Sequence, residues 1–531
     1  MSQLEGMESK LTGELEAVRV KIENLRRQRA ALESRIAAIR SLPNEILAHI
    51  FELGVTDELE PEPEPEEEVA EEDEGQATKV EFRLLVSQVC RMFREVAICT
   101  PSLWTQIHIL YLVPGRINFA QICVERSGGA RLDILVDCDD LYTENTPELI
   151  LRLMSILGPH TARFKRFTAR LRGFQYLHLV MRELNRPAPE LETLELSDIN
   201  YDKAFNEVET FEPLDLCGPL TLFGGVTPKL SRIYLDGAHV AWAKCDFTGL
   251  VELRLEHHTQ DVRPSYDEFK AIIDASPDLH SLDLCGSAPV LSEDATEASL
   301  YPPLRLDRLE TLHISSIPSE YITILISLLH APNLQSLSLT DLDTNDYSAF
   351  FRRIVGPPVL FPALTALKLA AVEAEEVAFE ALLGALPSVT YLALYFHRLE
   401  PTLLTCLELQ GPKRQVLCPK LDLLKCVGAA AHDIKQVLEK RQQAGFPISR
   451  LQIDQETENV GTKSCMEWIR ENATVEIIEP SEHDSDEEPY DSGSEWTDED
   501  ELGGIPYFSM EGFSDESSDG SVMDVDGSEW G

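Results

Sequence analysis

One short phrase returns along much of this chain and restricts the folds that the chain can adopt. It has the form P-x-L-x-x-L-x-L, with Val, Ile or Cys in place of one leucine in some copies, and the position of its first leucine recurs every 20 to 39 residues. Each L-x-L is a period-two pattern that places its leucines on one face of a strand. A proline before the first leucine ends any preceding helix, because proline cannot continue one. Nine copies are present, the third and fifth without proline: PELETLEL (189–196), PKLSRIYL (228–235), LVELRL (250–255), PDLHSLDL (277–284), LETLHI (309–314), PNLQSLSL (332–339), PALTALKL (362–369), PSVTYLAL (387–394) and PKLDLLKC (419–426).

Helical patterns lie between several of these copies. The first helical pattern opens with a capping-box sequence from Ser265 to Glu268. A unit of strand, loop, helix and proline cannot bury its leucines alone, whereas stacked units can. The pattern resembles leucine-rich repeats, which implies an α/β solenoid over residues 111–478. The helices are expected at 147–157, 266–276, 320–330, 375–386 and 465–473, and the less regular strands at 131–138, 162–171, 446–453 and 475–478.

The repeats depart from the common leucine-rich pattern at one position. The residue three past the last leucine is usually Asn, whose side chain bonds along the turns. In the clear copies here it is apolar, namely Ile199, Ile317, Leu342 and Val372. An apolar column therefore replaces the Asn column, and we expect an irregular solenoid.

The side chains between the strand leucines point away from the leucine core. In leucine-rich-repeat proteins this face commonly binds other proteins, so the resemblance implies a surface that docks a protein substrate. The alternative for any single residue is a solvated strand face. The candidate substrate-binding residues are Glu195, Arg232, Tyr234, Arg254, Asp283, His313, Lys368 and Tyr391.

The first forty residues are expected to form one helix with a coiled-coil seam. From Leu11 the apolar residues step by fours and threes to Ile39, interrupted by Arg29. One interpretation of 1–40 is a coiled coil that makes the protein a dimer. The alternatives are a helix that folds back on the body and a basic helix that contacts the acidic segments.

Residues 41–110 carry three motifs in a fixed order. They are LPNEILAHIF, VSQVCRMFREVA and TPSLW. Their order resembles the F-box, in the version common among fungal proteins, with an acidic, disordered insert at 56–79. Phe93 stands where the family usually has Trp and keeps an apolar anchor. We expect a helix that ends at Gly54 and a second one over 82–98 within a three-helix module.

The F-box resemblance implies that this module docks to a Skp-type adaptor and, through it, to a cullin ubiquitin ligase. A module of this size cannot bury all its large apolar side chains. Leu42, Pro43, Ile46, Leu47 and Ile50 are expected to face the adaptor, and Trp104 to pin the module to the downstream part of the chain. The full set of adaptor-binding candidates is Leu42, Pro43, Ile46, Leu47, Ile50, Phe51, Val89, Cys90, Phe93 and Trp104.

The net charge of −46 is concentrated in two segments. Residues 57–74 contain twelve carboxylates and 481–531 contain eighteen, with no Lys or Arg in either. Such composition favours disorder, so 479–531 is expected to be an acidic disordered tail. The acidic balance also argues against a nucleic-acid partner, because phosphate binding needs clustered Lys and Arg.

Little in the sequence points to catalysis, metal or membrane. The eleven cysteines form no zinc-type spacing, and His257 and His258 follow Leu255 as an isolated pair. We expect no cofactor, no metal, no membrane span and no enzyme activity, and a location in the cytoplasm or nucleus. The predicted function is the substrate-recognition subunit of a Skp–cullin–F-box ligase. The alternatives are an interaction scaffold without a ligase and an acidic nuclear regulator that binds basic proteins.

Overall fold

The computed structural model describes most of the chain between Val18 and Ile478. The described residues are 18–29, 42–59, 81–138, 145–199, 216, 218–291, 301–340, 346–396, 402–407 and 416–478. The acidic insert from residue 60 and the predicted acidic tail lie outside them, as does most of the predicted coil. Of that coil, 18–29 is helical, and its apolar residues Val18, Ile22 and Leu25 are exposed. Dimerisation through this helix stays a prediction.

Three helices and one short 3-10 turn come next in the chain. They are α2 (Asn44–Leu59), α3 (Phe82–Val89), α4 (Arg91–Ile98) and η1 (Pro101–Trp104). The expectation of one helix over 82–98 was wrong. Cys90 is extended (φ −157°, ψ 170°) and breaks that helix, and its Sγ accepts a hydrogen bond from the Phe93 backbone N–H at 3.4 Å. Cys90 therefore acts as the N-cap of α4.

The expected end of the first helix at Gly54 was also wrong, since α2 continues to Leu59. A Cβ at Gly54 would lie 2.3 Å from Cε1 of Phe82. Glycine therefore allows α2 to approach α3 closely and does not terminate the helix.

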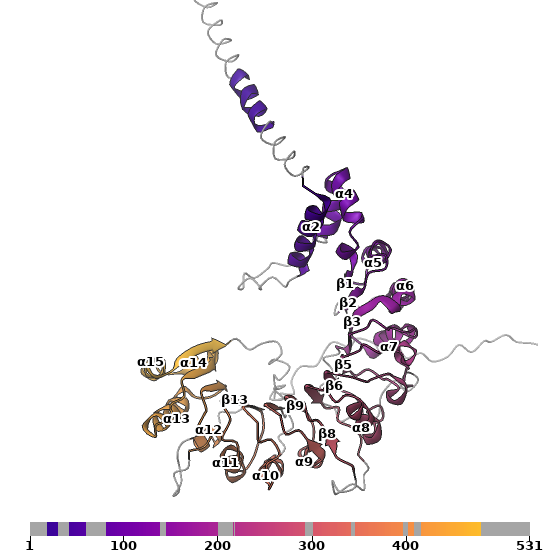
Figure 1. Ribbon diagram of the computed structural model, residues 1–531. Coiled ribbons are helices and arrows are strands. Elements are labelled where there is room, and N and C mark those ends of the chain that lie inside the picture. The colour runs from indigo at the N-terminus through magenta and orange to yellow at the C-terminus, as the bar shows by residue number, and fades with distance from the viewer. Residues whose placement is uncertain are drawn as a thin grey trace, which may run out of the picture. The chain divides into compact units, whose positions relative to one another are not determined.

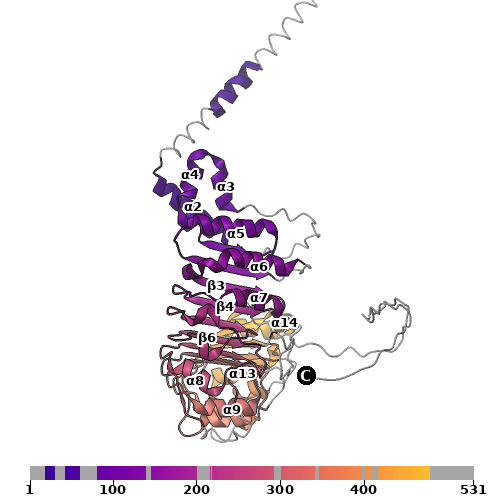
Figure 2. The same ribbon diagram turned by 90° about the vertical axis from the view of Figure 1, so that its right-hand side faces the viewer.

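Fourteen parallel strands form one sheet in chain order (Figure 1). All nine leucine phrases contain one of its strands, as predicted. Figure 2 shows these strands stacked in successive layers. The strands are β1 (Gln106–Ile109), β2 (Leu132–Cys138), β3 (Phe164–Leu171), β4 (Thr193–Asp198), β5 (Arg232–Asp236), β6 (Glu252–Glu256), β7 (Ser281–Cys285), β9 (Thr311–Ser315), β11 (Ser336–Thr340), β12 (Ala366–Ala370), β13 (Tyr391–Tyr395), β14 (Leu423–Val427), β15 (Arg450–Asp454) and β16 (Thr474–Ile478).

Helices cover one side of this sheet, and the strands form the other side (Figure 1). Leucines at the second and fourth strand positions, such as Leu253 and Leu255, are buried between the two layers. The capping box at Ser265 and Glu268 is present at the start of α8. The helices are α5 (Pro114–Arg126), α6 (Thr146–Leu157), α7 (Phe174–Glu183), α8 (Tyr266–Asp274), α9 (Ser319–Leu328), α10 (Ser348–Val355), α11 (Glu376–Ala385), α12 (Thr402–Leu407), α13 (Ala431–Gln443), α14 (Gln455–Val460) and α15 (Lys463–Asn472).

The strands end in a repeated backbone turn that takes the place of an Asn column. The residue after six of the strands has a left-handed φ between 47° and 72°. In five consecutive examples the turn residue donates its N–H to the carbonyl of the last residue of the next strand, as from His257 to Cys285 at 3.0 Å. Of the expected apolar column, Ile317 and Val372 are buried and Ile199 is half-buried, whereas Leu342 lies outside the described residues. The six left-handed residues are Gly237, His257, Gly286, Ser316, Ala371 and Gly428.

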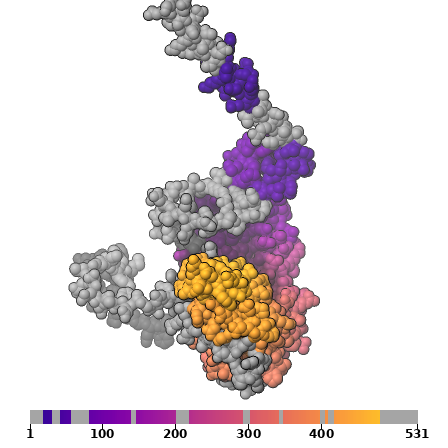
Figure 3. All heavy atoms as spheres, turned by 90° about the vertical axis from the view of Figure 1, so that its left-hand side faces the viewer, coloured from indigo at the N-terminus to yellow at the C-terminus, as the bar shows by residue number. Residues whose placement is uncertain are grey.

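Both ends of the sheet extend beyond the leucine phrases. At the N-terminal end, β1 pairs with β2 in parallel, although Gln106–Ile109 falls within the segment assigned to the F-box from sequence. At the C-terminal end, β15 and β16 extend the sheet, and the last repeats form one continuous surface, coloured orange to yellow (Figure 3). A separate two-stranded sheet pairs β8 (Leu304–Arg305) with β10 (Leu329–His330). In the part of the chain that the structure describes, every helix is too short or too polar to cross a bilayer.

Candidate interaction surfaces

The N-terminal module carries an exposed apolar surface, which we call the box face. It combines Ile46, Ile50 and Leu53 of α2, which are 48%, 46% and 57% exposed, with Leu85 and Val89 of α3, which are 48% and 66% exposed. Ile46, Ile50 and Leu53 share one side of α2 because they are spaced by four and three residues. Several large apolar side chains exposed on two neighbouring helices favour an interaction site, whereas single exposed apolar residues do not.

Several residues predicted to bind an adaptor lie elsewhere. Leu47 and Phe51 are only 2% exposed, because they occupy the side of α2 that packs on α3 and α4. The Phe51 ring meets Phe93 edge to face, with 5.1 Å between centroids. Leu47 and Phe51 therefore do not contribute to the exposed box face, and their role at an adaptor stays a prediction. Of the other candidates, Pro43 and Val89 are exposed, and Leu42, Cys90 and Phe93 are half-buried.

Trp104 is fully buried and cannot contribute surface to a partner in this conformation. Its indole Nε1–H donates to the carbonyl of Ala97 in α4 at 2.8 Å. On the other side, the Arg126 guanidinium of α5 lies over the indole ring, 4.4 Å from its centroid. Trp104 therefore ties the three-helix module to the first repeat, which is the second role expected from sequence.

A buried arginine that sequence reasoning missed makes a second connection. Arg83 of α3 has no exposed surface, and its Nη1 donates to the carbonyls of Leu103 and Gln106 at 3.1 and 2.6 Å. Its Nη2 pairs with Glu81 at 3.2 Å, and Glu81 also pairs with Arg116 of α5. Because a buried charge is costly unless it is paired and hydrogen-bonded, these contacts hold α3 against β1 and α5.

The sheet surface opposite the helices brings most of the predicted substrate-binding residues into one row, which we call the strand row. Glu195, Tyr234, Arg254, Asp283, His313 and Lys368 occupy equivalent positions on six of seven consecutive strands, and Ser338 occupies that position on the remaining one. Arg232 and Tyr391 lie two residues earlier, in the adjacent row. Arg232 is exposed, and the other seven candidates are half-buried.

Ion pairs link the N-terminal half of the strand row across neighbouring strands. Arg170 pairs with Glu195 at 2.6 Å and with Asp137 at 3.2 Å. Arg254 pairs with Glu256 and with Asp283, the latter at 3.4 Å, and its guanidinium lies 4.6 Å from the centroid of the Tyr234 ring. Such networks order long side chains and hold a defined pattern of charge.

Burial shifts the acid–base behaviour of this row. Burial raises the pKa of Asp283 to about 7, although the neighbouring Arg254 opposes the shift. Burial also lowers the pKa of His313 to about 4, with further lowering by Lys368 and Arg254. At neutral pH His313 is therefore uncharged, and the charge of Asp283 changes around neutrality.

The C-terminal half of the strand row has a different character. Lys368 and Lys425 both place their ammonium groups over the ring of Tyr395, 4.7 and 4.8 Å from its centroid. An ammonium over an aromatic face is attracted by the ring quadrupole. The row therefore passes from a mixed-charge network to a pair of lysines around one tyrosine.

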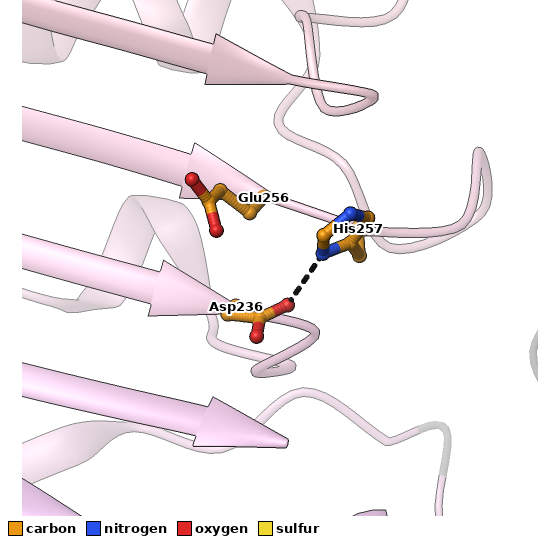
Figure 4. Close-up of side chains that lie close together, drawn as sticks. All are labelled: Asp236, Glu256 and His257. Carbon is orange, nitrogen blue, oxygen red and sulfur yellow. Dashed lines mark hydrogen bonds and ion pairs between the residues drawn. The ribbon is translucent and has the colours of Figure 1, made fainter. Parts of the chain in front are cut away.

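The carboxyl ends of β5 and β6 hold a cluster that sequence reasoning treated as an isolated histidine pair (Figure 4). Asp236, Glu256 and His257 each place one potential metal-ligating atom within 4.8 Å of the others. Strand register therefore places two carboxylates beside His257, and the expectation of no bound metal stays a prediction. These groups also bond within the protein, since Asp236 accepts from Ser197 and Glu256 accepts from Tyr234, both at 2.7 Å. No local pattern signals the cluster, because its members meet only through strand register.

Comparisons with known proteins identify the domain that carries the box face. Residues 39–110 match the family model described as F-box-like. A search of curated proteins returned no match. Residues 39–110 are therefore an F-box-like domain, and the parallel sheet beyond it is a leucine-rich-repeat fold.

Three solved structures show distant likeness over most of the chain. An internalin of Listeria monocytogenes is 10% identical, with a TM-score of 0.29 over 76% of this chain and 91% of that chain. The structure of the yeast Rad7–Elc1 complex is 15% identical, with a TM-score of 0.30 over 75% of this chain and 92% of that chain. A leucine-rich-repeat protein of Leptospira interrogans is 12% identical, with a TM-score of 0.23 over 72% of this chain and 91% of that chain. Because these TM-scores are below 0.5, the fold assignment rests on the strand order and register described above.

Proposed function

We propose that this chain is the substrate-recognition subunit of a Skp–cullin–F-box ubiquitin ligase. The box face binds the Skp-type adaptor, and the strand row binds a protein target. A location in the cytoplasm or nucleus is part of the proposal. The observation that carries it is the exposure of Ile46, Ile50, Leu53, Leu85 and Val89 on one F-box-like domain.

The chemistry of the box face supports an apolar partner. Five branched aliphatic side chains between 46% and 66% exposed present an area that a partner can remove from water. Each such side chain contributes roughly 1.5 to 3 kcal/mol when fully buried. Association also costs the translational and rotational entropy of two molecules. The burial free energy of these side chains is therefore an upper bound on their contribution to the binding free energy.

In this proposal the chain positions the target for ubiquitin transfer and does not itself make or break covalent bonds. A target held on the repeats lies near the ubiquitin-transfer machinery that the adaptor and cullin bring. Holding two reactants together raises their effective concentration, which is the source of the rate gain. The strand row suits a polar protein surface, because it offers charged, hydrogen-bonding and aromatic side chains in register.

The experiment measures binding of the purified full chain to a Skp-type adaptor by calorimetry. Ile46→Asp combined with Ile50→Asp is expected to weaken binding at least roughly a hundredfold, because each substitution would bury a carboxylate in an apolar interface. Since both are already exposed, the variant should keep the wild-type unfolding temperature.

The matched control is Val377→Asp, which places a new carboxylate on an exposed valine of α11, 73% exposed and far along the chain from the box. Its adaptor affinity should equal that of the wild type. Unchanged affinity in the Ile46 and Ile50 variant would contradict the box face as the adaptor site. Absence of binding by the wild-type chain would contradict the ligase function and favour a scaffold that works without an adaptor.

A further inference from the structure

Three neighbouring strands bring a carboxylate, an imidazole and a thiol into line. Asp236 ends β5, His257 follows β6, and Cys285 ends β7. The Nδ1 of His257 lies 2.9 Å from Oδ1 of Asp236, and its Nε2 lies 3.7 Å from Sγ of Cys285. The three side chains are ordered in space as a nucleophile (Cys285), a base (His257) and a group that orients the base (Asp236). This arrangement activates nucleophilic side chains.

We propose that Cys285 is a histidine-activated thiol and a site of oxidation by peroxides. In this arrangement Asp236 orients the imidazole of His257 through a hydrogen bond, and the imidazole accepts the proton of the Cys285 thiol. The reactive form is a thiolate beside an imidazolium. The site lies on the surface that carries the strand row, two residues beyond Asp283 on the same strand.

The position of the histidine ring is fixed from both sides. Asp236 is 7% exposed, and its second oxygen accepts a 2.7 Å hydrogen bond from the hydroxyl of Ser197. A carboxylate held in this way keeps a proton on Nδ1 and orients Nε2 toward the sulfur. Burial alone would lower the pKa of His257, but the hydrogen bonds to Asp236 and Cys285 raise it to about 11.

The other charged groups of the site are largely paired with each other. Glu256, beside Asp236 in register, accepts from Tyr234 and pairs with Arg254. Arg254 also pairs with Asp283, on the strand of the thiol. His257 is then the cationic partner for both Asp236 and the thiolate.

The oxidation balances with peroxide as the only added reactant. The thiolate sulfur attacks one peroxide oxygen, an S–O bond forms, and the O–O bond breaks. The leaving hydroxide takes the proton from the imidazolium and departs as water. Sulfur loses two electrons to give a sulfenic acid, and the peroxide gains them.

Other cysteines provide a contrast within the same chain. Burial raises the pKa of Cys123 to about 12 and that of Cys418 to about 11, so both stay protonated and shielded. Cys99 is exposed at the C-terminal end of α4 and serves as the reference for an ordinary accessible thiol. Cys285 is half-buried and remains open to a small reagent.

The test measures alkylation of the full chain by iodoacetamide between pH 6 and 9, quantified for each cysteine by mass spectrometry. At pH 6 Cys285 should react at least roughly tenfold faster than Cys99, because only the thiolate reacts. Its rate should change little up to pH 9, whereas that of Cys99 should rise. After exposure to hydrogen peroxide, dimedone should label Cys285.

His257→Asn removes the imidazole with a residue that tolerates the left-handed turn. It should reduce the rate at Cys285 to that of Cys99 and restore an ordinary pH profile. Ser316→Asn, at the corresponding turn after β9, should leave the rate unchanged and controls for the turn itself. Equal rates for Cys285 and Cys99 at pH 6, or a fast rate that survives His257→Asn, would overturn the activation. Absence of dimedone labelling would overturn the assignment to peroxide.

Discussion

At the scale of single residues, tight packing explains a position where sequence reasoning failed. Gly54 was expected to end its helix, since glycine is common after helix ends. It lies inside α2 instead, where its missing side chain leaves room for the ring of Phe82. Helix preference and packing therefore make opposite predictions for an alanine at this position.

Gly54→Ala is expected to lower the unfolding temperature. Alanine gains about 1 kcal/mol of helix preference over glycine. A Cβ 2.3 Å from Phe82 forces a shift in a packed interface, which typically costs about 1–3 kcal/mol, so the loss should dominate. In Gly384→Ala, within α11, the new Cβ would meet Leu417 at an ordinary 3.6 Å and should not destabilise. Thermal unfolding of the two variants checks this, and a more stable Gly54→Ala would show that the helices can separate without cost.

At the scale of elements, a left-handed turn residue recurs after six strands of the sheet. Three of the six turn residues are glycine, and three are His257, Ser316 and Ala371. A left-handed conformation costs residues with a Cβ roughly 1–2 kcal/mol. The hydrogen bond from each turn to the next strand holds the conformation despite this cost.

The left-handed turns predict opposite effects on stability for an alanine-to-glycine and a glycine-to-alanine substitution. Ala371→Gly should stabilise the protein by up to about 1 kcal/mol, because glycine adopts the left-handed turn without strain. Gly428→Ala should destabilise it by more than about 2 kcal/mol, since strain adds to a Cβ only 2.4 Å from the carbonyl oxygen of Phe396. Denaturant unfolding measures both, and equal signs would mean that the turns do not constrain the fold.

Local patterns account for the elements that sequence reasoning predicted correctly. The leucine phrase combines a period of two with a preceding proline, and all nine copies contain strands. The break at Cys90 was missed because a thiol is not a usual helix cap. The contacts of Arg83, the burial of Phe51 and the cluster around His257 depend on residues twenty or more positions apart. Register and packing bring such residues together, and a single sequence does not encode register explicitly.

At the scale of the whole molecule, the F-box-like domain and the repeats share buried contacts. The Arg126 guanidinium of α5 lies over the Trp104 ring, and Arg83 donates to the carbonyl of Gln106 in β1, the first strand of the sheet. Trp104 and Arg83 are buried, whereas Ile46, Ile50 and Val89 of the same domain are exposed. The domain therefore uses Trp104 for internal support and leaves several aliphatic side chains exposed.

The most direct measurement is amide hydrogen exchange of the full chain, alone and with a Skp-type adaptor. Binding should slow exchange in peptides from α2 and α3, around residues 44–59 and 82–89, and leave the strands β4 to β13 unchanged, because the box face is expected to be the adaptor site. Protection confined to the strands, or no protection of α2 and α3, would contradict the account.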